Sequence, residues 1–402
     1  MTAAVAPLVP AIPVSRVMNC ILAAVLLIGL YFPSSLDREQ SVWLWALPGF
    51  VALGAFATIL MVYGAPGPSF LCAGIATGCL VLFTLTTPLW ALSPGALLPY
   101  SVVLILLCAD LSKIEFAWPL RAAWLVLNVV TIALAALIIA DYQPAKAFLV
   151  ANYSAFYSVL VPNMLAAGKP VLMFGSHSIA AFFFSVCYYL HFKSYEAARS
   201  KWSFLAAVAY LVLLLFLKSV SAYSLFVAGA GLLVYHTRRR RGALLLLSVV
   251  VTAGVAVATV APGIAWQGFA VDVEKAWTAP ESGFLGRYSL SGVLANDLEY
   301  LNAHPFRGIG IGFSENLWYG DSGPIELLIR GSIPLLLSFY GALWFFLRAN
   351  LKSRSTAVAV FVMYMAFEIA YSNLLYLRTA CMLPFVIVYL NSLRTAAAGG
   401  QS

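Results

Sequence analysis

Charged residues are scarce in this sequence. Only 9% of its 402 residues are Asp, Glu, Lys or Arg, whereas 63% are hydrophobic. A soluble globular protein carries about 25% charged residues, so this composition excludes an ordinary soluble domain. Such a high apolar fraction predicts an integral membrane protein instead.

Paired cysteines and histidine clusters are missing as well. The six cysteines lie inside apolar runs without a C-x-x-C pair, and the sequence has only four histidines. We therefore expect neither structural disulfides nor a zinc site, and we predict no metal and no cofactor. The cysteines are interpreted as small buried hydrophobic residues. They are Cys20, Cys72, Cys79, Cys108, Cys187 and Cys381.

A complete nucleotide-binding motif is also absent. The run G-I-G-I-G from Gly308 to Gly312 resembles part of a phosphate loop, but no Gly-Lys-Ser/Thr follows it. We interpret Gly308 and Gly310 as parts of a tight turn that docks a loop on the membrane domain, with His304 in the same loop. The net charge of +8 predicts no nucleic-acid partner, because basic residues in short loops on one membrane face explain it.

Long hydrophobic runs dominate what is present. Segments of about 17 to 25 apolar residues can span a bilayer. The sequence predicts about twelve such helices in one all-α polytopic membrane domain, residues 1–402. The predicted spans are residues 15–32, 42–62, 69–90, 96–112, 120–140, 173–191, 202–217, 221–235, 242–261, 325–348, 356–371 and 373–391.

Basic residues predict the orientation of these helices. If the N-terminus is cytoplasmic, most of the 23 Lys and Arg residues fall in short cytoplasmic connections, as the positive-inside rule requires. We therefore expect both termini in the cytoplasm. Two long segments, residues 141–173 and 262–324, then lie outside it, and the chemistry is expected at this outer face.

The stretch from His304 to Pro334 gathers glycine, aromatic and charged residues beside a hydrophobic helix. A Gly-Pro pair within it is typical of a helix start, where free N–H groups favour an anion. Asp321, just before this pair, is either a helix cap or a general base that takes a proton from a hydroxyl. Glu326 and Arg330 are four residues apart, which favours an ion pair over a catalytic role for Glu326.

Several cations are predicted at the outer rim. Arg378 lies within an apolar run, where a guanidinium normally faces a polar cavity or a partner. Glu368 is a candidate partner for it, and snorkelling to the surface is the alternative. Arginines bind phosphate oxygens in pairs, so a cluster of cations would suit a diphosphate. The candidates are Arg287, Arg330, Arg378 and Lys218.

Some of these candidate site residues also have a purely structural explanation. Arg287 is also explained as an ordinary solvated charge, and turn chemistry explains most of the polar residues around Lys218. His177 lies at the outer start of a predicted helix and is a candidate base or diphosphate ligand. A helix-terminal polar residue is the alternative for it, and His304 is a weaker candidate.

Four passages resemble the bacterial O-antigen ligase and Wzy-type polysaccharide polymerase family. They are Arg287 followed by N-A-H-P-F-R-G-I-G-I-G-F, then D-S-G-P-I-E-L-L-I-R-G-S-I, G-K-P-V-L-M-F-G-S-H-S-I-A-A and S-V-S-A-Y-S-L-F-V-A-G-A-G-L-L-V-Y. Asp321 stands where ligases have a histidine, which favours a polymerase. Ala222 stands near where an arginine is common, and Lys218 is a candidate for that cationic role.

The resemblance implies a GT-C-like fold and a metal-independent glycosyltransferase of the bacterial inner membrane. Its donor and acceptor would be glycans on undecaprenyl diphosphate, joined into an exopolysaccharide, capsule or O-antigen. The arginines would stabilise the leaving diphosphate, and Asp321 or His177 would assist deprotonation. Besides membrane lipid, a chain-length regulator and a flippase are candidate partners. The alternatives are a ligase that transfers glycan to lipid A or protein and, less favoured, a polysaccharide transporter or flippase.

Overall fold

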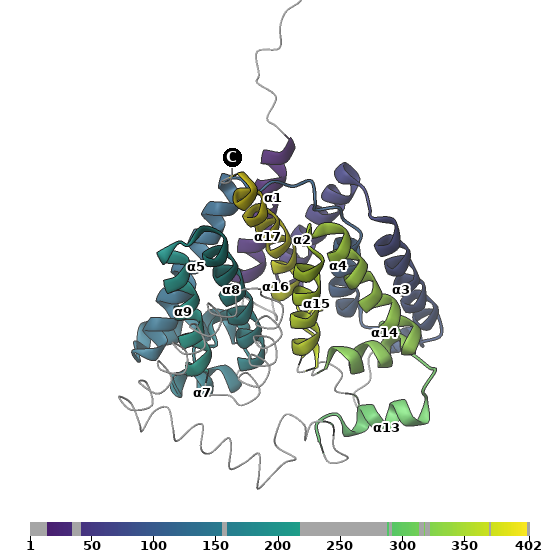
Figure 1. Cartoon of the computed structure of the whole chain (residues 1–402). Coiled ribbons are helices and arrows are strands. Elements are labelled where there is room, and N and C mark those ends of the chain that lie inside the picture. Colours follow the sequence, from purple (N-terminus) through teal and green to yellow (C-terminus); the bar gives the residue numbers. More distant parts are fainter. Residues whose placement is uncertain are drawn as a thin grey trace, which may run out of the picture.

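The described part of the chain is a bundle of helices. The computed structural model describes residues 14–33, 42–154, 159–217, 288, 292–312, 317, 322–369 and 371–399. Within these ranges the β-type pairing is limited to one isolated bridge between Leu92 and Gly312. Most of the helices run along the bundle, and α13 (Ala295–Ala303) lies across its lower end in Figure 1.

Five helices of the described residues are long and apolar enough to cross a membrane. They are α1 (Val14–Tyr31), α2 (Val42–Tyr63), α3 (Gly67–Leu85), α5 (Trp118–Ile139) and α14 (Gly323–Asn350). This confirms the all-helical fold and indicates a multi-pass membrane protein. In α3 only 22% of the apolar window is buried inside the protein, as expected for a helix that faces lipid.

The prediction of twelve spans is wrong. Three of the predicted spans are helices of 14, 16 and 15 residues, below the roughly 17 that a bilayer requires: α4 (Pro94–Leu107), α9 (Lys201–Phe216) and α15 (Arg354–Glu368). α8 (His177–Ala198) has 22 residues, but polar side chains lower its hydropathy, and most of it is buried by other helices. The predicted spans 221–235 and 242–261 lie outside the described residues.

Backbone breaks explain further differences from the prediction. A 3-10 turn at Leu172–Phe174 and a left-handed Gly175 (φ 69°) delay the start of α8 to His177. α14 is broken at Gly331 and Ser332, and Ser332 has a φ of 59°. The last predicted span is divided into a non-helical stretch, residues 371–376, and the helices that follow it. These are α16 (Leu377–Ala380) and α17 (Met382–Gly399).

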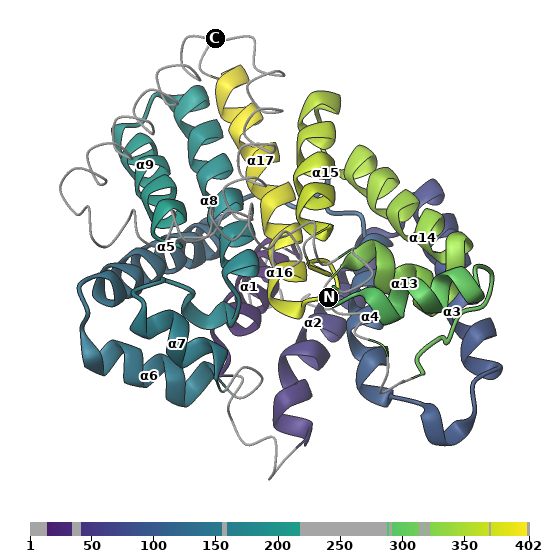
Figure 2. The same cartoon turned by 90° about the horizontal axis from the view of Figure 1, so that it is seen from below.

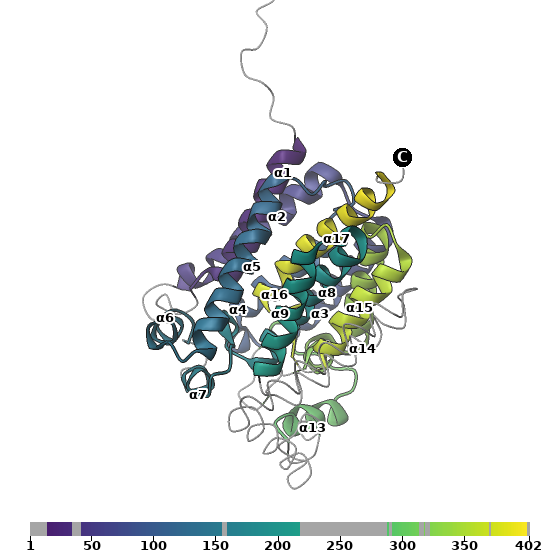
Figure 3. The same cartoon turned by 60° about the vertical axis from the view of Figure 1, so that its left-hand side comes forward.

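The two predicted outer segments contain helices of their own. Residues 141–173 form α6 (Gln143–Tyr153) and α7 (Leu160–Ala166). Of residues 262–324, the described ones include α13, which packs on α14 through Leu294, Ile325 and Ile329. In Figures 1 and 3, α7 and α13 lie at the same end of the bundle, and Figure 2 views the molecule from that side. We call this the cavity end, because the two cavities of the candidate site lie there.

A polar cluster joins α5, α8 and α9 inside the bundle. Asn128 Oδ1 accepts a hydrogen bond from Tyr210 OH at 2.7 Å and lies 2.7 Å from His191 Nε2. Trp124 stacks on the His191 ring with centroids 4.8 Å apart. Hydrogen bonds of this kind stabilise helix packing where water is absent.

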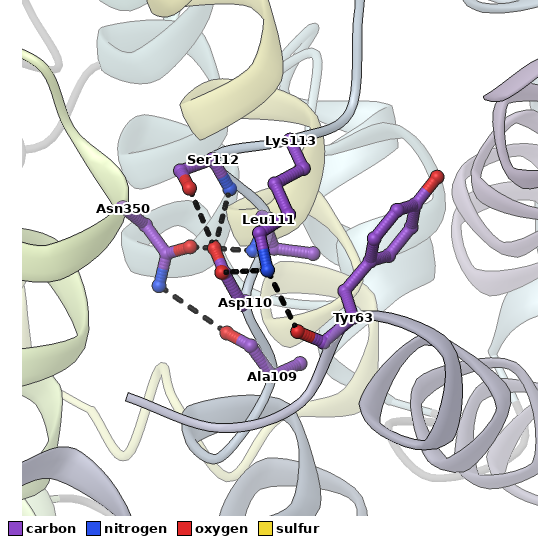
Figure 4. A network of polar contacts seen from close by, with 7 residues as sticks. All are labelled: Tyr63, Ala109, Asp110, Leu111, Ser112, Lys113 and Asn350. Carbon is purple, nitrogen blue, oxygen red and sulfur yellow. Dashed lines mark hydrogen bonds and ion pairs between the residues drawn. The ribbon is translucent and has the colours of Figure 1, made fainter. Parts of the chain in front are cut away.

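The opposite end of the bundle, which we call the connection end, is joined by contacts to the backbone (Figure 4). Asn350, the last residue of α14, accepts from the Leu111 N–H at 2.5 Å and donates to the Ala109 carbonyl at 3.2 Å. Lys113 forms an ion pair with Asp110 at 3.2 Å. The two contacts of Asn350 attach the α4–α5 connection to the end of α14, whereas the ion pair lies within the connection itself.

Candidate functional site

Two buried carboxylates lie at the cavity end. Glu326 is in the first turn of α14 and Glu368 is the last residue of α15. Their exposed fractions are 9% and 1%. A buried carboxylate is tolerated only where hydrogen bonds or a cation compensate its lost hydration, and both have such partners.

Glu326 is contacted from three parts of the chain. Ser372 Oγ donates to Oε2 at 2.7 Å, and Tyr100 OH lies 3.4 Å from Oε1. Arg330 Nε is 3.8 Å from Oε1, so the expected ion pair is present. The Glu326 carboxylate therefore contacts two hydroxyl groups in addition to the ion pair along its own helix face.

Glu368 connects the start of α14 to the 371–376 segment. Its Oε2 accepts from Tyr340 OH at 3.2 Å, and its Oε1 accepts from the Leu374 N–H at 2.6 Å. A Cβ on Gly323 would lie 1.8 Å from Oε2, so this position cannot carry a side chain without movement of Glu368. The expectation that Glu368 pairs with Arg378 is wrong, because the two side chains have different partners.

Arg378 is buried against the end of α1. It is 7% exposed, and its guanidinium donates to the carbonyls of Leu30 and, at 3.0 Å, Phe32. Its Cζ lies 5.3 Å from the centroid of the Tyr153 ring, a cation–π contact. Burial raises the pKa of Tyr153 although Arg378 opposes this, so the phenol stays neutral. The snorkelling alternative does not fit a guanidinium this deeply buried.

Two cavities meet at the 371–376 segment. The arginine cavity, about 280 Å³, is lined by Arg378 and Tyr153 and by mostly apolar residues of α1, α2 and α4. The glutamate cavity, about 170 Å³, is lined by Glu326, Arg330 and Ser372. Both cavities share the wall residues Pro99, Tyr371, Leu375 and Tyr376. A buried guanidinium and a buried carboxylate thus lie on the two sides of one wall.

Arg330 supports the break in α14. The residue that would bond its carbonyl in a continuous helix is Pro334, which has no N–H. Gly310 N–H donates to that carbonyl at 2.8 Å instead, and the Arg330 guanidinium donates back to the Gly310 carbonyl at 3.1 Å. The guanidinium also donates to the Gly312 carbonyl. Arg330 is therefore held by the glycine turn as well as by Glu326.

The turn around Gly308 and Gly310 packs on α3 and α14. A Cβ on Gly308 would lie 2.4 Å from the Arg330 carbonyl oxygen. Gly310 has a φ of +55°, and a Cβ there would lie 2.4 Å from the Thr84 N–H nitrogen. Both positions therefore require glycine. His304 is exposed at the end of α13 and lines neither cavity.

Of the remaining candidates for catalysis or diphosphate binding, the structure describes only His177, which lines neither cavity. His177 begins α8, two residues after Gly175, which lines the arginine cavity. Asp321, Arg287 and Lys218 lie outside the described residues. Of the residues chosen from the sequence, the structure thus brings together Glu326, Arg330 and Arg378.

Sequence reasoning missed three residues of this site. Tyr100 and Tyr153 are two of 20 tyrosines, and nothing in the sequence near them indicates a role. Ser372 had a weak signal, because it begins a short polar interruption, Ser372-Asn373, between two apolar runs. These residues become informative only when packing places them beside Glu326 or Arg378.

Comparisons with protein-family models, curated proteins and solved structures find no match for this chain. The resemblance to polysaccharide ligases and polymerases therefore stays a prediction from short motifs.

Proposed function

We propose that this protein joins polyprenyl-diphosphate-linked glycan repeat units into a surface polysaccharide. One observation carries the proposal: a buried arginine and a buried glutamate line neighbouring cavities divided by the 371–376 segment. Glycosyl transfer from a lipid carrier needs a cation for the departing diphosphate and a base for the attacking hydroxyl. The two cavities offer these groups side by side.

The arginine cavity suits the carrier. Its apolar lining, which includes Phe32, Leu98 and Phe174, matches the first isoprene units of a polyprenyl chain. The Arg378 guanidinium has five N–H donors, two of which bind backbone carbonyls. When the bond from the anomeric carbon to the diphosphate breaks, its electron pair passes to the diphosphate oxygen, which this cation stabilises.

The glutamate cavity suits the acceptor sugar. Glu326 takes the proton of the attacking hydroxyl as that oxygen bonds to the anomeric carbon. Ser372 and Tyr100 fix the direction of the carboxylate. The Tyr371 and Tyr376 rings, 5.9 Å apart and edge to face, provide aromatic surface for a sugar ring in the wall between the cavities. Asp321 remains a second candidate for the base.

The proposal places the cavity end outside the cytoplasm of a bacterial inner membrane. The basic residues support this orientation, because many of them lie at the connection end, as the positive-inside rule requires of a cytoplasmic side. They are Lys113, Arg121, Lys193, Arg199, Lys201, Arg348, Lys352 and Arg354. Both chain termini would then be cytoplasmic, because α1 begins and α17 ends at this end.

Reconstitution tests the proposal. The purified protein is placed in liposomes with lipid-linked repeat units extracted from a strain that lacks its gene, without any other protein. We expect products with growing numbers of repeats on the lipid carrier. Transfer of glycan only to added lipid A or protein would favour a ligase, and movement of unchanged repeats across the bilayer would favour a transporter. Either result would contradict a polymerase.

A further inference from the structure

A third cavity lies at the connection end, away from the site described above. It has a volume of about 350 Å³. The last turns of α8, the connection between α14 and α15, the start of α15 and the second half of α17 enclose it. Its lining residues are Lys193, Glu196, Ala197, Leu351, Lys352, Ser353, Thr356, Leu390, Asn391 and Leu393.

Hydrogen-bond donors dominate the polar part of this lining. Lys193 and Lys352 contribute ammonium groups, and Ser353 and Thr356 contribute hydroxyl groups. Glu196 is the carboxylate of the lining, and Lys193 Nζ contacts it at 2.8 Å. Ammonium and hydroxyl groups together are the usual partners of phosphate oxygens. The charges therefore favour an anion of the phosphate type.

The apolar part of the lining points to a lipid. Leu351 and Leu390 are 4% and 7% exposed and lie beside the polar groups. The candidate membrane span of α14 ends at Asn350, directly before Leu351 and Lys352. The cavity is thus at the level of lipid headgroups, where basic pockets between helices bind anionic lipids.

We propose that this cavity binds the phosphate of an anionic glycerophospholipid. Lys193 and Lys352 contact the phosphate, and Leu351 and Leu390 contact the first carbon atoms of the lipid chains. The lipid site and the proposed polymerase activity are independent proposals, because this cavity lies at the connection end, whereas Glu326 and Arg378 lie at the cavity end. A soluble phosphate ester shares the charge of the headgroup but lacks the chains.

Substitutions at Glu196 and at Lys352 should change the affinity for lipid in opposite directions. A bound phosphate competes with the Glu196 carboxylate for the Lys193 ammonium. Removing the charge of Glu196 should therefore strengthen lipid binding, whereas removing the charge of Lys352 should weaken it. General damage to the fold would not produce effects in both directions.

Native mass spectrometry of the delipidated full-length protein, titrated with phosphatidylglycerol, measures this binding. We expect Lys352→Gln to weaken it about fivefold, as for one cation near a membrane surface, and Glu196→Gln to strengthen it by a similar factor. Lys201→Gln is the matched control, because this lysine is exposed at the same end but outside the cavity. It should leave binding unchanged.

Three outcomes would overturn the proposal. Equal losses in Lys352→Gln and Lys201→Gln would mean a diffuse surface charge rather than a site. Weaker binding in Glu196→Gln would contradict the competition for Lys193. Displacement of phosphatidylglycerol by glycerol 3-phosphate at the same concentration would mean that the cavity takes a soluble phosphate ester and not a lipid.

Discussion

The two ends of the bundle differ in how far their charged side chains are exposed. At the cavity end Glu326, Arg330 and Arg378 are 9%, 3% and 7% exposed. At the connection end the side chain of Lys113 is 59% exposed in its pair with Asp110. An exposed pair contributes about 0–1 kcal/mol, whereas burying a charge costs several kcal/mol before its partners compensate. The charges at the cavity end are therefore held at a cost that the exposed pair at the connection end does not have, and such buried charges are typical of functional sites.

Arg378→Ala should have the largest effect on polymer formation. We expect a fall of about 10³-fold in turnover, because the variant removes the cation of the arginine cavity. The assay is chain lengthening in the reconstituted system. Arg307→Ala is the control, since Arg307 is exposed at the same end and should tolerate the change. Normal polymer from folded Arg378→Ala protein, judged by an unchanged melting temperature, would exclude this residue from the chemistry.

Glu326→Gln should have the next largest effect. The variant keeps the shape and an acceptor for Ser372 but loses the base, so the single-turnover rate should fall about 10²-fold. Retention of the lipid carrier should stay unchanged, which separates chemistry from binding. Glu299→Gln is the control, because this glutamate is exposed on α13 at the same end. An unaltered rate would leave Glu326 with only a structural role.

Glu368→Gln, at the same end of the bundle, should have a smaller effect on turnover. Glutamine can still accept from the Leu374 N–H, but its contact with Tyr340 changes, so the 371–376 segment is held less firmly. We expect turnover to fall about tenfold, within the range for a group that orients another. Because Tyr340 and Glu368 act together, the double variant with Tyr340→Phe should be no slower than Glu368→Gln alone. Additive losses would mean that the two residues act separately.

Asn350→Ala should have the smallest effect on activity and a clear effect on stability. It leaves the Leu111 N–H and the Ala109 carbonyl without their partner, which costs about 1–3 kcal/mol for each buried group left unsatisfied. The melting temperature should fall, while turnover well below it should equal that of the wild type. A specific loss of turnover would show that the two ends are coupled more tightly than the comparison suggests.

Helices were predictable where apolar residues continue without interruption. The bounds of α1, α2 and α5 lie close to the predicted spans 15–32, 42–62 and 120–140. The prediction failed where tertiary contacts decide the backbone. The break in α14 at Gly331 depends on the hydrogen bond that the Gly310 N–H donates to the Arg330 carbonyl, and hydropathy along the chain does not indicate this contact.

Of the candidate site, only the charged residues could be predicted from the sequence. Arg378 and Glu326 stand out in the sequence because ionised groups beside apolar runs are costly. Their separate cavities, and the wall formed by Tyr371 and Tyr376, arise from packing between α4 and the 371–376 segment. Ser372 likewise gains meaning only through its 2.7 Å contact with Glu326.

A structure of the protein with undecaprenyl diphosphate, determined by cryo-electron microscopy in nanodiscs, tests the central claim most directly. The account predicts phosphate density within hydrogen-bonding distance of the Arg378 guanidinium, with the first isoprene units in the arginine cavity. Diphosphate density at the connection end, beside Lys352, with none at Arg378 would contradict it.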